Sequence, residues 1–307
     1  MATAPSTRTW RSTRPVALMG VLGVFRRGAG DPSLARAPDG SVTRAMRTPE
    51  GVATLELRCA PAQSLVIASA WGPGAEWALA QAPDLLGESD DPSGFVPRHP
   101  AVADAARRFA GWRVPRSGLV LDALVPAVIE QKVTGEEAFG GYRRLLRRFG
   151  EQAPGPWGDR GLVAPPTARE WAMLPSWEYL RARVDPRRSG TVVRAARVAG
   201  RLEEATAMQV SAARSRLRAV PGVGAWTAAE VAQRALGDAD AVSFGDYHVA
   251  RDIGWALTGS PVDDDGLAAL LEPYAGHRYR VQRLLELAGA RLPRRGPRMP
   301  RRTHLPG

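Results

Sequence analysis

The stretch from Val220 to Asp246 constrains the fold of this chain more than any other part. It opens with Val220-Pro221-Gly222-Val223-Gly224, continues as a helix-like run to Leu236, and stops at Gly237. Two glycines around one apolar residue predict a tight turn whose backbone amides stay uncovered by side chains. Because a helix follows at once, unpaired N–H groups and the positive end of the helix dipole are exposed there, which suits a phosphate group. Alternatively, the two glycines form an ordinary turn between helices.

An acidic residue follows this predicted helix. Asp246 comes after the apolar, strand-like connector Val242-Ser243-Phe244-Gly245, where another helix must begin. Aspartate is a preferred N-cap residue, so capping is one interpretation of Asp246. A helix N-terminus also favours the ionised form of the carboxyl group, so Asp246 is expected to carry a negative charge there.

The glycine turn, the helix and the Gly245-Asp246 pair together resemble the helix-hairpin-helix DNA glycosylases, and among them the DNA-3-methyladenine glycosylase II family. The resemblance extends from about residue 15 to residue 289, and the hairpin is its most specific part. It implies that the hairpin grips the DNA backbone, that a damaged nucleotide is flipped out of the duplex, and that Asp246 stabilises the oxocarbenium-like sugar and orients water.

The resemblance therefore implies excision of alkylated purines of the 3-methyladenine type in base excision repair. One alternative is a non-catalytic DNA-binding or damage-sensing protein, because the same hairpin occurs in proteins that only hold DNA. Another is a glycosylase for an oxidised or deaminated base.

The pattern of the whole chain predicts an α+β fold, with a small N-terminal antiparallel β-sheet domain carrying a helix and then an all-α helix-hairpin-helix glycosylase core. The expected divisions are a disordered segment 1–14, an α+β domain 15–100, a helical domain 101–290, and a basic disordered tail 291–307. The strand-like runs are Val16–Phe25, Ser41–Met46, Val52–Cys59 and Ser64–Ala70, and a helix is expected over Ala75–Leu86. Polar and apolar residues alternate from Ala53 to Arg58, which predicts a half-buried strand.

The second half of the chain is predicted to be helical. Leu121–Gln131 is apolar nearly all round, as in a central buried helix. Capping boxes are expected at Thr134 and at Thr167, and N-caps at Ser189 and Ser211. Four arginines, at 143, 144, 147 and 148, fall on the polar side of the helix that follows Thr134, either as a solvated face or as DNA backbone contacts.

Position 226 bears on the chemistry. The bifunctional members of the family carry a lysine there that attacks the sugar, whereas this chain has Trp226, which cannot form a Schiff base. The single lysine of the chain is Lys132. We therefore expect a monofunctional glycosylase without lyase activity.

The remaining site residues follow from the same resemblance. Gln131 and Lys132 stand where similar proteins insert a side chain into the duplex, although both also suit a polar helix end. The best-known family member has an aromatic residue where this chain has Glu230, which either attracts a cationic base or faces solvent. Trp226 either walls the base pocket or packs in the core. The expected DNA-binding residues are Gln131, Lys132, Pro221, Gly222, Val223, Gly224, Ala225 and Thr227, and the expected base pocket is Trp226, Glu230, Phe244 and Tyr274.

Composition agrees with a polyanionic partner. The 307 residues carry a net charge of +11, and 41 of the 42 basic residues are arginine, which also fits a GC-rich genome. A single cysteine and four scattered histidines give no disulfide, iron–sulfur or zinc pattern, so we expect no metal and no cofactor. The arginine-flanked run Val16–Phe25 lacks a signal-cleavage site, so we expect a cytoplasmic monomer that binds damaged double-stranded DNA and no membrane. The basic tail either adds DNA attraction or improves solubility.

Overall fold

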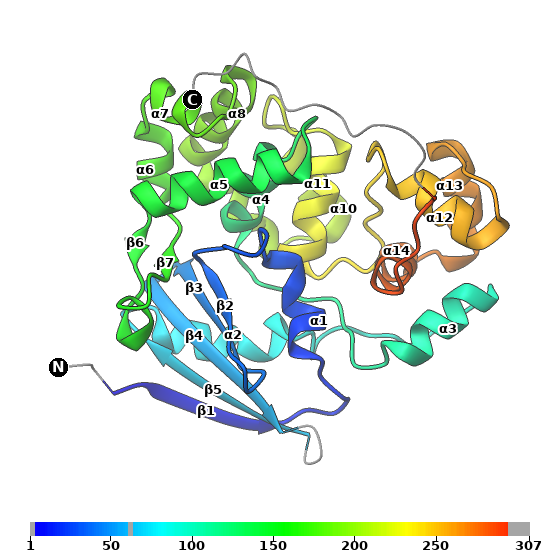
Figure 1. Cartoon of the computed structure of the whole chain (residues 1–307), viewed down its shortest axis with the longest axis horizontal. Helices are drawn as coiled ribbons and strands as arrows, with labels where there is room; N and C mark the ends of the chain where they lie inside the picture. The colour runs from blue at the N-terminus through cyan, green and yellow to red at the C-terminus, as the bar shows by residue number, and fades with distance from the viewer. Residues whose placement is uncertain (1–3, 61–63, 294–307) are drawn as a thin grey trace.

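A five-stranded antiparallel sheet begins the fold in the computed structural model, which describes residues 4–60 and 64–293 (Figure 1). The strands lie in the order β1-β5-β4-β3-β2. Their bounds are β1 Ser6–Arg11, β2 Leu34–Arg36, β3 Val42–Thr48, β4 Gly51–Ala60 and β5 Leu65–Trp71. Helix α2 (Ala75–Leu85) packs against β1, β4 and β5, and buries Ala78, Leu79 and Ala82. The predicted fold class, a small antiparallel sheet domain followed by helices, is confirmed.

The expectation of disorder over residues 1–14 is wrong for Ser6–Arg11. This segment is the edge strand β1, which pairs with β5 from Ser6 opposite Ala70 to Arg11 opposite Leu65. Most of its side chains are exposed, so the segment contains no apolar run that would reveal a strand. Residues 1–3 lie outside the described part of the chain.

The expected buried strand at Val16–Phe25 is also wrong. The segment forms helix α1 (Leu18–Leu22) and a 3₁₀ turn (Gly23–Phe25). Val21 and Leu22 are fully buried. A short apolar run is consistent with either structure, because periodicity alone cannot distinguish a buried strand from a buried helix.

Strand β4 is buried on both faces, not on one. Thr54 and Glu56, which lie on the face expected to meet solvent, are covered by residues 151–164, a segment that connects two helices of the second half of the chain. Its strands are β6 (Glu151–Gln152) and β7 (Val163–Ala164), with a 3₁₀ turn (Gly155–Trp157) between them. The Thr54 hydroxyl donates to the Pro154 carbonyl at 2.8 Å, and the Trp157 indole donates to Glu56 at 3.0 Å.

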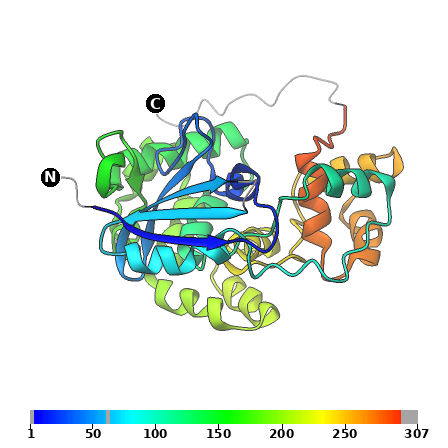
Figure 2. The same cartoon turned by 90° about the horizontal axis from the view of Figure 1, so that it is seen from below.

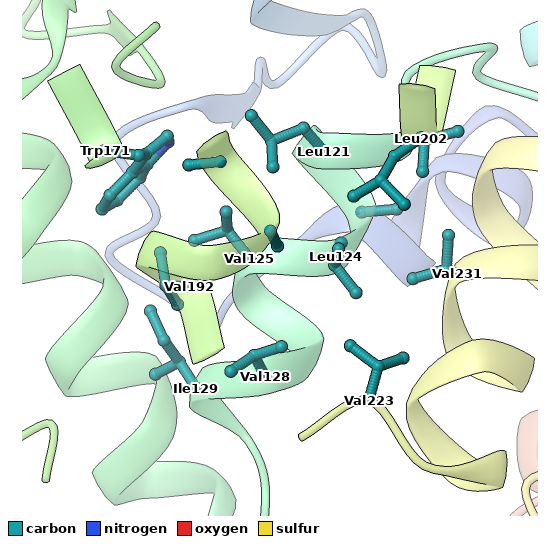
Figure 3. Packing of buried hydrophobic residues seen from close by; sticks show 14 of the residues in the cluster. Leu121, Leu124, Val125, Val128, Ile129, Trp171, Val192, Leu202, Val223 and Val231 are labelled. Carbon is teal, nitrogen blue, oxygen red and sulfur yellow. The ribbon is translucent and has the colours of Figure 1, made fainter. Parts of the chain in front are cut away.

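The first group of helices surrounds α4 (Val120–Ile129), in which every residue except Asp122 is buried, as predicted (Figure 3). Helices α5, α8, α9 and α11 contact it. The single polar residue of α4, Asp122, forms an ion pair with Arg44 of β3, which joins this group to the sheet. The other bounds are α5 Gly135–Phe149, α6 Ala168–Met173, α7 Ser176–Arg181, α8 Pro186–Arg197, α9 Ala199–Glu203, a 3₁₀ turn Glu204–Ala207, α10 Val210–Arg218 and α11 Ala225–Val231.

Two of the predicted helix caps are confirmed and two are wrong. Thr167 forms the complete capping box with Glu170, whereas at Thr134 the cap is present as one half of the expected box, in which the Thr134 side chain accepts a hydrogen bond from the Glu137 amide. Ser189 lies buried inside α8, which Asp185 caps instead, with Pro186 at the first helical position. Helix α10 begins directly after Gln209, so Ser211 is not its cap. The Asp-Pro pair was the signal for the true start of α8.

A second group of helices lies to one side of the first (Figure 2). It comprises α3 (Pro100–Arg108), α12 (Val249–Thr258), α13 (Asp264–Leu271) and α14 (Arg278–Leu287), with a 3₁₀ turn at Glu272–Tyr274. These helices share a separate hydrophobic core. The expected helical domain 101–290 therefore contains two cores, because the chain forms α3 beside α14 before it returns to α4.

Candidate active site at the hairpin

The hairpin has the predicted geometry. Helix α10 leads into the turn at Pro221–Gly224, and α11 begins at Ala225 with no side-chain cap. The amides of its first turn therefore have no intrahelical acceptor. Pro221, Gly222, Gly224 and Ala225 are exposed, while Val223 is buried in the core. Helix α11 continues as a π-helical turn (Ala232–Leu236), and Gly237 ends it in the left-handed conformation, at the predicted stop.

The two hairpin glycines have different roles. Gly222 has φ +99°, a conformation that L-residues with side chains rarely adopt, and a Cβ there would overlap Thr191 Oγ1 of α8. Gly224 has φ −90°, and a Cβ there would meet nothing within 4 Å. The fold therefore requires glycine at 222, whereas at 224 the absence of a side chain leaves the backbone open to a ligand.

Asp246 sits at the start of α12. One carboxylate oxygen, Oδ1, accepts hydrogen bonds from the amides of His248 (2.7 Å) and Val249 (3.1 Å). Among the described residues no donor contacts the other oxygen, Oδ2, and the side chain is partly exposed. Asp246 therefore caps the turn that leads into α12, whose own N-cap residue is His248, and this cap orients a carboxylate that keeps one oxygen available.

A buried polar network joins the segment before Asp246 to the hairpin helix. The Ser243 hydroxyl donates to Glu230 at 2.6 Å and accepts from the side-chain amides of Gln233 (2.8 Å) and Gln282 (3.1 Å). The other Glu230 oxygen pairs with Arg234 at 2.8 Å. Glu230 and Ser243 are both buried. The network links α11, α14 and the connector 242–246, so the connector is held in place although it is not a strand.

The end of α4 completes the site. Glu130 pairs with the buried Arg27 of the N-terminal domain, with 2.7 Å between Oε1 and Nε. Burial raises the pKa of Glu130. The charges of Arg27 and Arg234 oppose that shift, and the charges of Glu230 and Asp246 add to it. Asp246 is therefore within electrostatic reach of α4, although the two are far apart in sequence.

Gln131 and Lys132 extend from this end of α4. The Gln131 amide donates to the Gly222 carbonyl at 3.0 Å and to the Thr227 hydroxyl at 2.8 Å, so it ties the helix end to the hairpin. Lys132 is exposed and has φ +55°. A residue with a side chain in the left-handed region is strained, and such strain gathers at functional sites.

The residues expected in a base pocket do not all come together. Trp226 is half-buried beside the hairpin, and its Nε1 is buried with no hydrogen-bond acceptor in the described chain. Phe244 is partly buried against the core of the second helical group. Tyr274 lies inside that core, where its hydroxyl accepts from the amides of Arg98 (3.0 Å) and His99 (3.1 Å). The solvent-facing alternative for Glu230 is wrong, because that residue is 8% exposed and ion-paired.

Sequence reasoning missed one aromatic residue. Tyr247 directly follows Asp246 and is 71% exposed, and the Arg251 guanidinium lies 5.6 Å from its ring centre. Its position next to the aspartate was the available signal. A hollow of about 500 Å³ lies elsewhere, against α5 and α6, and is lined by Phe149, Met173 and Leu174 among others.

Residues 4–60 and 64–293 contain no cluster of three or more His, Cys, Asp or Glu side chains that could hold a metal ion. None of their helices is long and apolar enough to cross a membrane.

Comparison with known proteins agrees with this geometry. No family model matches the chain. The probable bifunctional transcriptional activator/DNA repair enzyme AlkA of Mycobacterium tuberculosis (strain H37Rv) is 30% identical over 243 residues, which cover 74% of this chain and 46% of that protein. The chain thus spans about half the length of the curated relatives it matches.

Solved structures establish the fold. A 3-methyladenine DNA glycosylase from Archaeoglobus fulgidus superposes with a TM-score of 0.75 at 17% identity, over 91% of this chain and 97% of that one. An 8-oxoguanine glycosylase/lyase from Clostridium acetobutylicum gives 0.70 at 12% identity, over 93% and 98%. The chain therefore has the fold of these DNA glycosylases. It is similar to the AlkA-like proteins, the 3-methyladenine DNA glycosylase II type.

Proposed function

We propose that this protein is a monofunctional DNA glycosylase that removes alkylated purines of the 3-methyladenine type from double-stranded DNA. It would act in base excision repair as a cytoplasmic monomer without a metal or cofactor. The observation that carries the proposal is the Asp246 carboxylate, which is oriented by two backbone amides, has one oxygen available, and follows the connector that Ser243 ties to the hairpin helix.

Asp246 would act on the sugar of a flipped nucleotide. As the N-glycosidic bond breaks, positive charge develops on the sugar, and a fixed carboxylate stabilises it without reorganisation. The cap bonds to Oδ1 restrict rotation of the group, so Oδ2 can face the sugar and a water molecule. The amides of the hairpin would bind a neighbouring phosphate, and Lys132 would contact the duplex from the end of α4.

The absence of lyase activity is part of the proposal. Lyase chemistry needs an amine, and the position of the family lysine is occupied by Trp226. The single lysine, Lys132, lies at the end of α4, where it would meet the duplex backbone. Borohydride reduction with abasic DNA should therefore trap no covalent complex, and trapping would refute this part of the proposal.

Preference for a cationic base would come from aromatic rings. Phe244 and the exposed Tyr247 flank Asp246 in the chain, and Trp226 lies in the first turn of the hairpin helix; an electron-rich ring favours a positively charged alkylated base. The charge of Glu230 is neutralised by Arg234, so Glu230 would not itself attract the base. Tyr274 is not part of the proposed pocket, because its ring is buried and its hydroxyl is bonded.

The test is single-turnover excision from methylated duplex by the parent, by Asp246→Asn and by a control, Asp263→Asn. Asp263 also caps a helix, accepting from the Gly266 amide, and asparagine preserves capping at both positions. We expect Asp246→Asn to lower the rate by roughly 10²–10³-fold, as for loss of one electrostatic catalytic group, and the control to match the parent.

Two outcomes would favour other functions. Tight binding by a parent that releases no base would favour a non-catalytic DNA-binding protein. Excision only of 8-oxoguanine or a deaminated base, in a panel of single-lesion duplexes, would favour a glycosylase of different specificity, to which the fold is equally suited.

A further inference from the structure

Two arginines outside the hairpin are each held over a glycine one helical turn earlier. On α8, Arg194 Nε donates to the Pro221 carbonyl at 3.1 Å and Nη2 donates to the Thr191 hydroxyl at 2.9 Å. A Cβ on Gly190 would lie 3.2 Å from Arg194 Nη1. The guanidinium therefore lies flat along the helix and reaches the hairpin.

The same arrangement occurs on α5. A Cβ on Gly140 would lie 3.2 Å from Arg144 Nη1, and Arg144 Nη2 donates to the Ala182 carbonyl at 2.6 Å. Both guanidiniums are bound only by oxygens that carry no charge, and both arginines are exposed. Each is therefore fixed in place but not neutralised.

Like charges accumulate between these two arginines. Arg183 lies on the connection from α7 into α8. Arg187 lies in the first turn of α8 and shares a face of that helix with Arg194, two turns or about 10 Å along the axis. Burial lowers the pKa of Arg144, the neighbouring charges of Arg183 and Arg143 lower it further, and the charge of Glu137 opposes part of this shift. Within the described chain, no carboxylate forms an ion pair with Arg144, Arg183, Arg187 or Arg194, because the nearby acids Glu137 and Asp185 pair with Arg188.

We propose that these four residues, Arg194, Arg187, Arg183 and Arg144, form an arginine row that binds the phosphates of the duplex flanking the lesion. The inference rests on the proposed DNA-binding function and extends the DNA path from the hairpin across α8 to α5. Its occupant is the DNA backbone, because Arg194 is bonded to the hairpin itself and a planar guanidinium matches a phosphate bidentately. A guanidinium that is already held loses little side-chain entropy on binding.

The experiment measures binding to an undamaged 30-base-pair duplex across a salt series. The row variant is Arg187→Gln with Arg194→Gln, and the matched control is Arg36→Gln with Arg169→Gln, which removes the same charge from exposed positions on β2 and α6. Each lost phosphate contact makes the slope of log K against log salt shallower by about 0.9. The slope of the row variant should therefore be shallower than that of the parent by about 1.8. The control should change the slope by less than about 0.3, because its arginines would contact no phosphate.

A third variant tests whether DNA binding depends on the position of the Arg194 guanidinium or only on the total positive charge of the surface. Gly190→Ala keeps every charge and favours the helix, yet it crowds Arg194 Nη1. We expect it to weaken binding by about two- to five-fold, the loss of a fraction of one phosphate contact. Unchanged binding by Gly190→Ala, together with equal slopes for the row and control variants, would overturn the inference.

The same measurements distinguish the inference from the proposed function. If the parent excises methylated bases and the row variant binds like the control, the arginine row is wrong and the enzyme proposal stands. If the parent excises nothing but the row variant loses the predicted slope, the row is supported and the enzyme proposal fails. A parent that does not bind duplex DNA would overturn both.

Discussion

The two glycines of the hairpin, at 222 and 224, should respond to alanine in opposite ways. Gly222→Ala places a side chain at φ +99°, which costs about 1–2 kcal/mol in free energy of unfolding for an L-residue. The added Cβ also overlaps Thr191 Oγ1 and lies 3.0 Å from Thr191 Cγ2, and forced overpacking typically costs about 1–3 kcal/mol. We therefore expect a total destabilisation of about 2–5 kcal/mol, of which the part due to overpacking comes from the contact with Thr191.

Gly224→Ala is the matched control for folding. Its φ of −90° suits alanine, and its Cβ would meet nothing within 4 Å. Its free energy of unfolding should stay within about 1 kcal/mol of the parent, because at a helix N-cap glycine is better than alanine by at most that much. DNA affinity should nevertheless fall, since the new methyl group would stand where a phosphate approaches the open amides.

The assay is urea unfolding, with DNA binding measured on the same proteins. Thr191→Ala combined with Gly222→Ala removes the overlapping atom, so the double variant should recover about 1 kcal/mol relative to the sum of the singles. Equal stability of the two glycine variants would refute the close-approach argument. If Gly224→Ala binds DNA as tightly as the parent, the proposal that the open backbone amides of the hairpin bind DNA is refuted.

The remaining predictions concern the polar network and pH. Ser243→Ala should lower the free energy of unfolding by about 2–3 kcal/mol, because a buried hydrogen bond to the Glu230 carboxylate is lost. In Ser243→Ala the rate of base excision should fall by a larger factor than the affinity for DNA. The control Ser215→Ala, on the exposed side of α10, should leave the excision rate and the affinity unchanged. An unchanged excision rate in Ser243→Ala would show that the network does not position Asp246. Burial alone would raise the pKa of Asp240, but the Arg278 hydrogen bonds outweigh it and the pKa is lowered. Above its ordinary pKa, the ionised Asp240 therefore stabilises the fold, and this contribution is lost as the pH falls below about 4. Asp240→Asn should make the free energy of unfolding depend less steeply on pH below about 4 and leave its dependence at higher pH unchanged. An unchanged dependence below about 4 would contradict this prediction.

Features that depend on local chain chemistry could be read from the sequence. The hairpin glycines, the stop at Gly237 and the capping box at Thr167 all appear where predicted, because backbone conformation and capping are set within a few residues. The burial of α4 was also predictable, since a helix that is apolar all round must be enclosed. The resemblance to the helix-hairpin-helix DNA glycosylases rests on the same short-range pattern.

Tertiary structure alone decided which polar and aromatic side chains meet. Glu230 is buried and accepts a hydrogen bond from Ser243 of the connector, Tyr274 lies in a core while Tyr247 is exposed, and Gln131 binds the hairpin instead of standing free. Each outcome depends on an element distant in sequence that covers or reaches the residue, and residue type specifies no such partner. The edge strand β1 shows the same limit, because its partner β5 is more than fifty residues away and its own side chains carry no apolar pattern.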